Sequence, residues 1–188
     1  SLIGKGNSQN QQQLEKYIGL LDFVQEEGAV SRLVPFRTNY AQQANNNTDK
    51  SYDLLMNKYS YSNIQTIQET EIRNVISFMY SHLNLSTNLL RNGEYEKAIL
   101  VADKYFETFP IFTKFDNTSV SMINVYVKTN QEDEYYRIDE MIKQCNKKKD
   151  ELESLKKLSS NNEYRLKFIK QNIEKLNEYN RIIRNTLE

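Results

Sequence analysis

The 188-residue chain has no tryptophan, one cysteine, one histidine, two prolines and five glycines. The single cysteine, Cys145, excludes an internal disulfide. The single histidine, His82, excludes a metal site built from several histidines. The 25 Lys and Arg balance the 25 Asp and Glu, so no excess of positive charge points to nucleic acid. Because proline and glycine are scarce, long uninterrupted elements are expected.

Long apolar runs are also missing. None approaches the ~20 residues that a membrane-spanning helix needs, so the chain itself is expected not to span a membrane. It begins with Ser1 rather than Met, and we therefore expect either a processed chain or a piece of a larger protein.

Catalytic motifs are absent from the sequence as well. It has no glycine-rich phosphate loop and no cluster of metal ligands. Adjacent acids such as Glu26 and Glu27 point in different directions, which does not suit general acid–base work. The sequence therefore predicts no catalytic residues, no metal and no cofactor.

Apolar residues recur at helical spacing through most of the chain and predict a mostly α fold. Gly28 would end the first helix. Residues 30–36 are expected to be a short extended segment, where Pro35 suits a sheet edge. We predict three regions: a flexible lead-in over 1–13, an N-terminal helix, extended segment and loop over 14–64, and a helical-repeat-like domain over 65–188. The predicted helices are 11–27, 52–59, 70–92, 94–109, a helix from 116 or 119 to 127, 132–158 and 163–187.

The last two helices are expected to pack as a long antiparallel pair. Apolar residues in 163–187 alternate by three and four, with Asn180 as one polar member. Helix 132–158 has a similar register, which Lys148 interrupts. The predicted seam consists of Leu166, Ile169, Ile173, Leu176, Asn180, Ile183 and Leu187 on one helix, and Ile138, Met141, Cys145, Leu152 and Leu155 on the other.

The segment 79–110 resembles a tetratricopeptide repeat, a helical hairpin of ~34 residues. His82 stands where that repeat usually has Trp, and the next 34 residues match poorly, so a generic pair of helices is the alternative. The matching positions are Gly93, Tyr95, Ala98, Pro110 and the small residue Ser86.

Three features invite a chemical role, and each has a simpler explanation. His82 has no nucleophile at a recognisable spacing, so we expect a packing or surface residue. Cys145 lies on an apolar stripe and is expected to be a buried structural thiol. The run "NKKKDE" (146–151) is expected to be a solvated helix face with local ion pairs; a phosphate or lipid contact is the alternative.

Two blocks of sequence carry a family resemblance. The first, "YIGLLDFVQEEGAVSRLVPFRT", covers 17–38, and the second, "SYDLLMNKYSYSNI", covers 51–64. They are followed by Arg73-Asn74 and by the hairpin at 89–110. In this order they resemble the C-terminal soluble region of the domain-of-unknown-function 2723 proteins. Those are multi-pass membrane proteins of the Bacteroidetes, related to membrane glycosyltransferases of the protein O-mannosyltransferase type.

The motif positions can be assigned one by one. Ser31 stands where the family usually has Tyr, and Tyr61-Ser62 stands where an aromatic-Gly pair is common. The first motif falls on Gly19, Leu20, Phe23, Glu27, Gly28, Arg32, Leu33, Val34 and Pro35, and the second on Tyr52, Asp53, Leu55, Met56, Asn57 and Lys58.

The resemblance implies an accessory domain of a membrane-anchored glycosyltransferase-like protein, on the periplasmic face of the inner membrane. The family's catalytic residues belong to its membrane part, which these 188 residues lack, so none is carried over. The domain would dock onto its own membrane part or onto a protein or peptide partner. The candidate docking residues are Arg32, Arg37, Tyr52, Asn57 and Lys58.

Two alternatives remain open. The two blocks can instead serve only to close the core over the first helix. The whole chain can also be a free-standing helical-repeat adaptor, cytoplasmic and without glycosyl chemistry.

Overall fold

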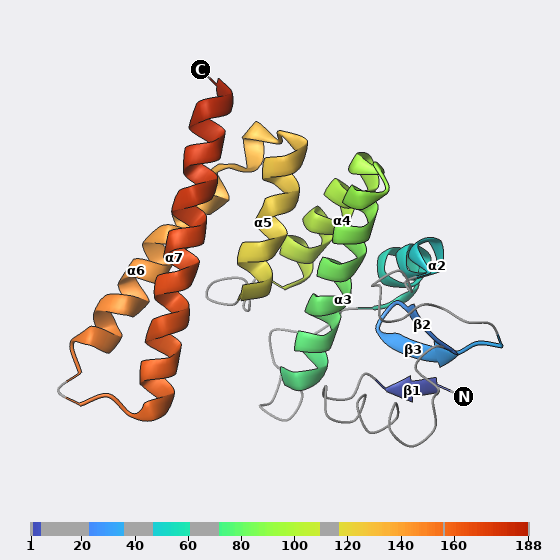
Figure 1. Ribbon diagram of the computed structural model, residues 1–188, viewed down its shortest axis with the longest axis horizontal. Coiled ribbons are helices and arrows are strands. Elements are labelled where there is room, and N and C mark those ends of the chain that lie inside the picture. The colour runs from blue at the N-terminus through green and yellow to red at the C-terminus, as the bar shows by residue number, and fades with distance from the viewer. Residues whose placement is uncertain are drawn as a thin grey trace. The chain divides into compact units, whose positions relative to one another are not determined.

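The computed structural model describes residues 2–4, 23–35, 47–60, 72–109, 117–155 and 157–187. The chain divides into two compact units, Ser1–Val101 and Ala102–Glu188. Most described residues are helical, which confirms the predicted fold class (Figure 1). Every helix among them is too short or too polar to cross a membrane. The predicted boundary at 64/65 lies outside the described residues.

The first unit begins with a small antiparallel sheet in the order β1-β3-β2. Glu27 lies opposite Val30, so only Gly28 and Ala29 form the turn. Gly28 has a φ of 62°, the left-handed value that tight hairpins require and glycine adopts at little cost. The strands are β1 (Leu2–Gly4), β2 (Val24–Glu27) and β3 (Val30–Leu33).

The sheet corrects three predictions. Residues 24–27, placed in a helix by their sequence, form β2, because Gly28 reverses the chain into a hairpin instead of capping a helix. Residues 2–4, placed in a flexible lead-in, form β1. The extended segment at 30–33 is confirmed, but it is the middle strand rather than an edge. Residues 5–22 lie outside the described part of the chain.

Among the described residues, four helical elements lie between the sheet and Thr108. The predicted short helix at 52–59 is confirmed, although it starts earlier and ends as a π-helix. The elements are α2 (Thr48–Asp53), the π-helix η3 (Leu54–Lys58), α3 (Ile72–Arg91) and α4 (Tyr95–Thr108).

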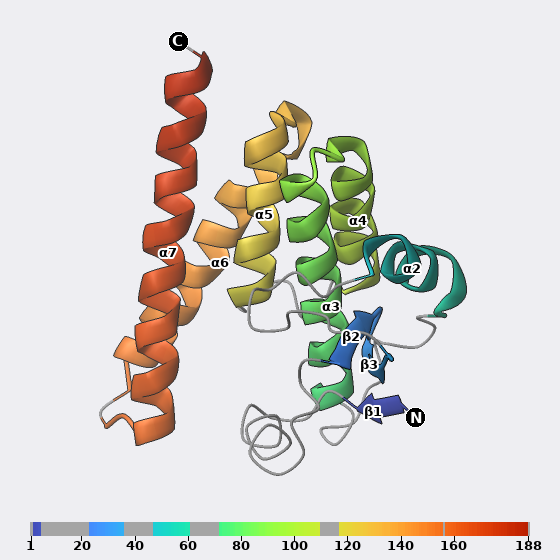
Figure 2. The same ribbon diagram turned by 45° about the vertical axis from the view of Figure 1, so that its right-hand side comes forward.

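The turn between α3 and α4 ends α3 in a regular way. Gly93 has a φ of 78°. The Gly93 N–H donates to the Leu90 carbonyl at 3.2 Å, and the Glu94 N–H donates to the Leu89 carbonyl at 2.9 Å. This is the Schellman pattern of a helix C-terminus. Ser86 and Ala98, two of the positions that match the repeat, are both fully buried. Figure 2 shows α3 beside α4.

The second unit contains the rest of α4 and the C-terminal helices. The long helix α7 contacts both α6 and α5, and Figure 1 shows α6 and α7 running antiparallel, as predicted. Asn130, with a φ of 57°, ends α5 in the way that Gly93 ends α3. The elements are α5 (Asn117–Thr129), the 3-10 helix η5 (Glu132–Glu134), α6 (Tyr136–Glu153) and α7 (Ser160–Leu187).

The connection between α6 and α7 differs from the prediction. α6 ends at Glu153 rather than near 158. The predicted break at 159–162 is instead the start of α7, where the Ser159 hydroxyl accepts the Asn162 N–H at 3.3 Å, a typical N-terminal cap. Leu155, predicted in the seam, lies in this connection and is 46% exposed.

Candidate docking site

The two sequence blocks of the family resemblance meet in the first unit. The Gly28 N–H donates to the Ser51 Oγ at 2.8 Å in a buried hydrogen bond. A Cβ added at Gly28 would lie 3.1 Å from the Tyr59 hydroxyl and 3.3 Å from the Leu54 Cβ. The β2–β3 turn therefore packs directly against the helical segment that carries the second block.

Glu27 of β2 pairs with one cation of its own sheet and with one cation of α2. Its carboxylate lies 3.1 Å from the Arg32 guanidinium and 3.2 Å from the Lys50 ammonium. Glu27 is only 4% exposed, and a buried charge requires such partners. Arg32, a candidate docking residue, is therefore engaged within its own unit.

The start of α2 is fixed to β2 as well. The Asn47 N–H donates to the Glu26 carbonyl at 3.0 Å. The Asn47 side chain in turn accepts the Lys50 N–H at 3.2 Å, which caps the helix. These contacts hold the second block at a set position beside the sheet.

The π-helix η3 separates buried from exposed residues of the second block. The Tyr59 N–H donates to the Leu54 carbonyl five residues earlier, at 2.9 Å. Leu55 is completely buried, whereas Asn57 and Lys58 are exposed. The Asn57 amide donates only locally, to the Asp53 carboxylate at 3.1 Å. Short π-helical turns are rare and frequently lie at functional sites.

The remaining candidate residues are placed differently. Tyr52 on α2 is half-buried, and the Lys97 ammonium lies 5.6 Å from its ring centre, a cation–π contact within the unit. Lys58 forms no ion pair with a described residue. Arg37 lies outside the described residues. Among the four candidates that the structure describes, Arg32 is exposed but paired with Glu27, whereas Asn57 and Lys58 are exposed without a hydrogen bond or ion pair to another described segment.

Sequence reasoning missed two residues that hold this region together. Ser51 is the first residue of the second block and Lys50 precedes it, but neither was singled out. Their partners, Glu27 and Gly28, were both in the first motif. A glutamate that is buried beside a hairpin glycine needs a nearby cation, and this requirement could have directed attention to Lys50.

His82 lies in the interior of the first unit. His82 is fully buried on α3, and its Nδ1 lies 2.8 Å from the Phe78 carbonyl. A carbonyl only accepts, so Nδ1 carries the proton. The described residues contain no group of three His, Cys, Asp or Glu that could hold a metal.

Cys145 is a buried thiol, as expected, at 1% exposure. Burial raises its pKa to about 11 from the usual 9.0. The thiolate, which is the reactive form, is therefore scarce at neutral pH. This environment suits a structural thiol.

Cys145 should make the stability of the chain fall above pH 9. Between about pH 9 and pH 11 the folded thiol keeps its proton while the unfolded thiol loses it. Ionisation therefore stabilises the unfolded state relative to the folded state as pH rises, and the free energy of unfolding falls. We expect a loss on the order of 2 kcal/mol that Cys145→Ala lacks. Urea unfolding of both chains at about pH 8 and about pH 10.5 measures it. The tyrosines are common to both chains and affect both equally. If the two chains lose the same free energy of unfolding between these pH values, the thiol is not buried.

No protein-family model, curated protein or solved structure matches the chain. The family resemblance of the two blocks therefore stays a prediction, and the geometry described above is the basis for the proposals that follow.

Proposed function

We propose that the chain is an accessory domain of a membrane-anchored glycosyltransferase-like protein and that its task is docking rather than catalysis. The observation that carries this proposal is the π-helix at the second block. It buries Leu55 completely while presenting Asn57 and Lys58 to solvent. A rare backbone form that exposes polar residues on a well-anchored segment is typical of a recognition site.

The anchoring of the segment supports the same proposal. The sheet and α2 are connected by the Glu27–Lys50 ion pair and by the buried hydrogen bond from Gly28 to Ser51, and Glu27 also pairs with Arg32 within the sheet. A docking surface of this kind loses little entropy on binding because it is already ordered. The partner that we propose is the protein's own membrane part, on the periplasmic face of the inner membrane, or an acceptor polypeptide held there.

The α3–α4 hairpin favours a second candidate function. Its Schellman turn at Gly93 and its buried small residues, Ser86 and Ala98, are features that helical-repeat proteins use to stack helix pairs. In that case the chain is a free-standing adaptor that binds a protein or peptide.

Site-specific crosslinking tests the docking proposal. A photoreactive amino acid at Lys58, in the intact protein that contains this chain, should crosslink to the membrane part of the same protein. The matched control is the same amino acid at Lys128, which is also exposed but lies in the other unit. Arg32 is unsuitable as a probe because it pairs with the buried Glu27.

The outcomes separate the two candidates. Crosslinking from Lys58 alone supports docking onto the membrane part. Capture of a separate polypeptide, in a protein whose coding sequence contains no apolar spans of ~20 residues, supports the adaptor. Equal crosslinking from both positions would contradict a specific docking site.

A further inference from the structure

The hairpin tip of the second unit, defined as the α6–α7 connection and the adjoining turns (143–170), is strongly basic. The segment contains nine Lys and Arg but four Asp and Glu. Three of those acids are already paired, in Lys148–Glu151, Lys149–Asp150 and Lys170–Glu153. These pairs account for most of the run "NKKKDE", as the sequence predicted.

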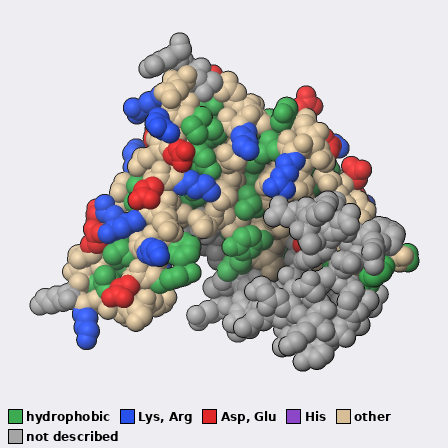
Figure 3. All heavy atoms as spheres, in the orientation of Figure 1, with side chains coloured by type: hydrophobic (Ala, Val, Ile, Leu, Met, Phe, Trp, Pro, Cys, Tyr) green, Lys and Arg blue, Asp and Glu red, His purple; other side chains and the backbone are tan. Residues whose placement is uncertain are grey.

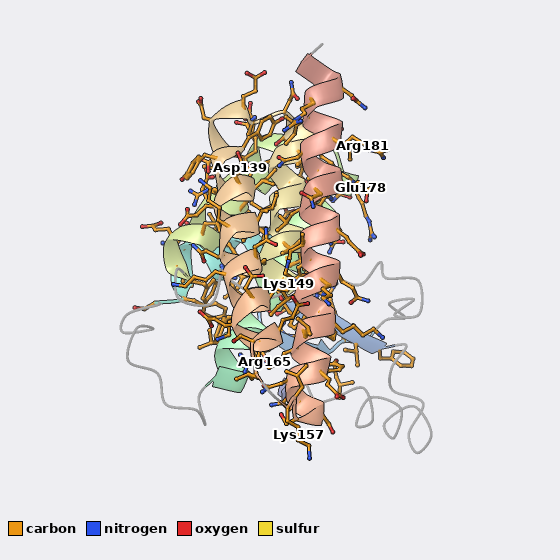
Figure 4. The ribbon with its side chains drawn as sticks, turned by 90° about the vertical axis from the view of Figure 1, so that its left-hand side faces the viewer. Asp139, Lys149, Lys157, Arg165, Glu178 and Arg181 are labelled. Carbon is orange, nitrogen blue, oxygen red and sulfur yellow. The ribbon has the colours of Figure 1, made fainter. Side chains whose placement is uncertain are left out.

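The positive charge that is left over lies on exposed side chains. These cations form no ion pair with any residue in the described ranges, so their charge is available to a partner. Figure 4 places Lys157 and Arg165 at the same end of the α6–α7 pair. The exposed cations are Lys143, Lys147, Lys157, Arg165 and Lys167.

Two apolar side chains accompany this charge. Leu155 is 46% exposed and Tyr164 is 62% exposed. The Tyr164 ring lies 4.6 Å from the Phe168 ring, which holds it in place on the first turns of α7. In Figure 3, green hydrophobic and blue basic side chains adjoin at the lower left, over this end of α6 and α7.

The charge is segregated along the unit although the chain as a whole is neutral. The far end of α6 and the preceding 3-10 helix carry Glu132, Asp133, Glu134, Asp139 and Glu140 against a single cation, Arg137. The far end of α6 is therefore acidic and the hairpin tip is basic, while the adjoining end of α7 carries Arg181 and Arg184. Such an arrangement orients a protein toward a negatively charged surface.

We propose that the hairpin tip contacts the headgroup layer of an anionic lipid membrane. Lys and Arg near such a surface are attracted to its negative potential, and each strengthens binding about fivefold. Tyr and Leu prefer the boundary between headgroups and acyl chains. An acidic peptide or a nucleic acid offers no such apolar layer in which Leu155 could be buried. An extended peptide typically binds in a groove or at a strand edge, whereas the tip is a connection between two helices. The proposal is independent of the docking function above.

Vesicle partitioning of the 188-residue chain tests the tip. On phosphatidylcholine vesicles with one-third phosphatidylglycerol we expect binding that high salt abolishes, and little binding to pure phosphatidylcholine. The triple variant Lys157→Glu/Arg165→Glu/Lys167→Glu should bind at least tenfold more weakly. The control Lys128→Glu/Arg181→Glu/Arg184→Glu changes the net charge equally, at exposed positions away from the tip, and should retain binding within about twofold.

Leu155→Ser/Tyr164→Ser distinguishes a membrane from other polyanions. It keeps every charge and alters only exposed side chains, so circular dichroism should be unchanged and partitioning should fall at least threefold. Three results would overturn the proposal: no preference for anionic vesicles, equal loss in the tip and control reversals, or undiminished binding of the Ser variant. Tighter binding to polyglutamate or to an oligonucleotide than to vesicles would assign the tip to an acidic macromolecule instead.

Discussion

Removal of α7, residues 160–188, is expected to unfold the second unit. α7 buries Ile169, Leu176, Tyr179 and Ile183, each at most 7% exposed. At ~1.5–3 kcal/mol for each buried apolar side chain, their loss removes about 6 kcal/mol or more, comparable with the total stability of a small domain. The shortened chain would also expose the apolar stripe of α6, and we expect it to self-associate in size-exclusion chromatography with light scattering.

A pair of point substitutions provides the control for this deletion. Leu176 is fully buried and Ile182, on the same helix, is 41% exposed. Leu176→Ala should cost about 2–5 kcal/mol, and Ile182→Ala should cost about 1 kcal/mol or less. A shortened chain that stays monomeric and equally stable would show that α7 serves an external partner rather than its own unit.

The pairing of α6 with α7 could be predicted because both helices repeat apolar residues at a period that one helix face can bury. The polar member of the seam was placed less well. Asn172, not Asn180, is almost fully buried at 1%, while Asn180 donates at its edge to the Asp139 carboxylate at 3.2 Å. The predicted seam provides one contact face on α7, for α6 alone. In the structure α7 also packs on α5, where Lys175 donates to Ser121 at 2.9 Å. A second contact face widens the buried surface beyond the heptad stripe.

The N-terminal region could not be predicted from local pattern. A glycine with positive φ ends a helix or starts a tight hairpin, and Gly28 looks the same for both. What decides is pairing with β3 and a hydrogen bond to Ser51, 23 residues away. The sequence could not show which of the candidate docking residues are accessible. The burial of Leu55 beside the exposed Lys58 depends on the π-helical turn, and such a turn has no simple sequence signal.

The contact between the two blocks leads to the second large expected effect, at Gly28. An alanine there must adopt a φ near 62°, which costs roughly 1–2 kcal/mol. Its Cβ would also lie 3.1 Å from the Tyr59 hydroxyl and 3.3 Å from Leu54, a crowding that adds about 1–3 kcal/mol. We expect Gly28→Ala to lower the free energy of unfolding by roughly 2–5 kcal/mol in urea titrations.

Gly93 offers a matched control within the same unit. Its φ is 78°, but a Cβ there would meet nothing within 4 Å, so Gly93→Ala should cost only the backbone strain of roughly 1–2 kcal/mol. The difference between the stability losses of Gly28→Ala and Gly93→Ala is then the cost of crowding between the two sequence blocks. Tyr59→Leu shortens the neighbour that a new Cβ would meet, so in a double-mutant cycle it should recover part of that excess. Equal losses at Gly28 and Gly93, with no coupling to Tyr59, would mean that the blocks do not pack together and that the anchoring of the docking segment is wrong.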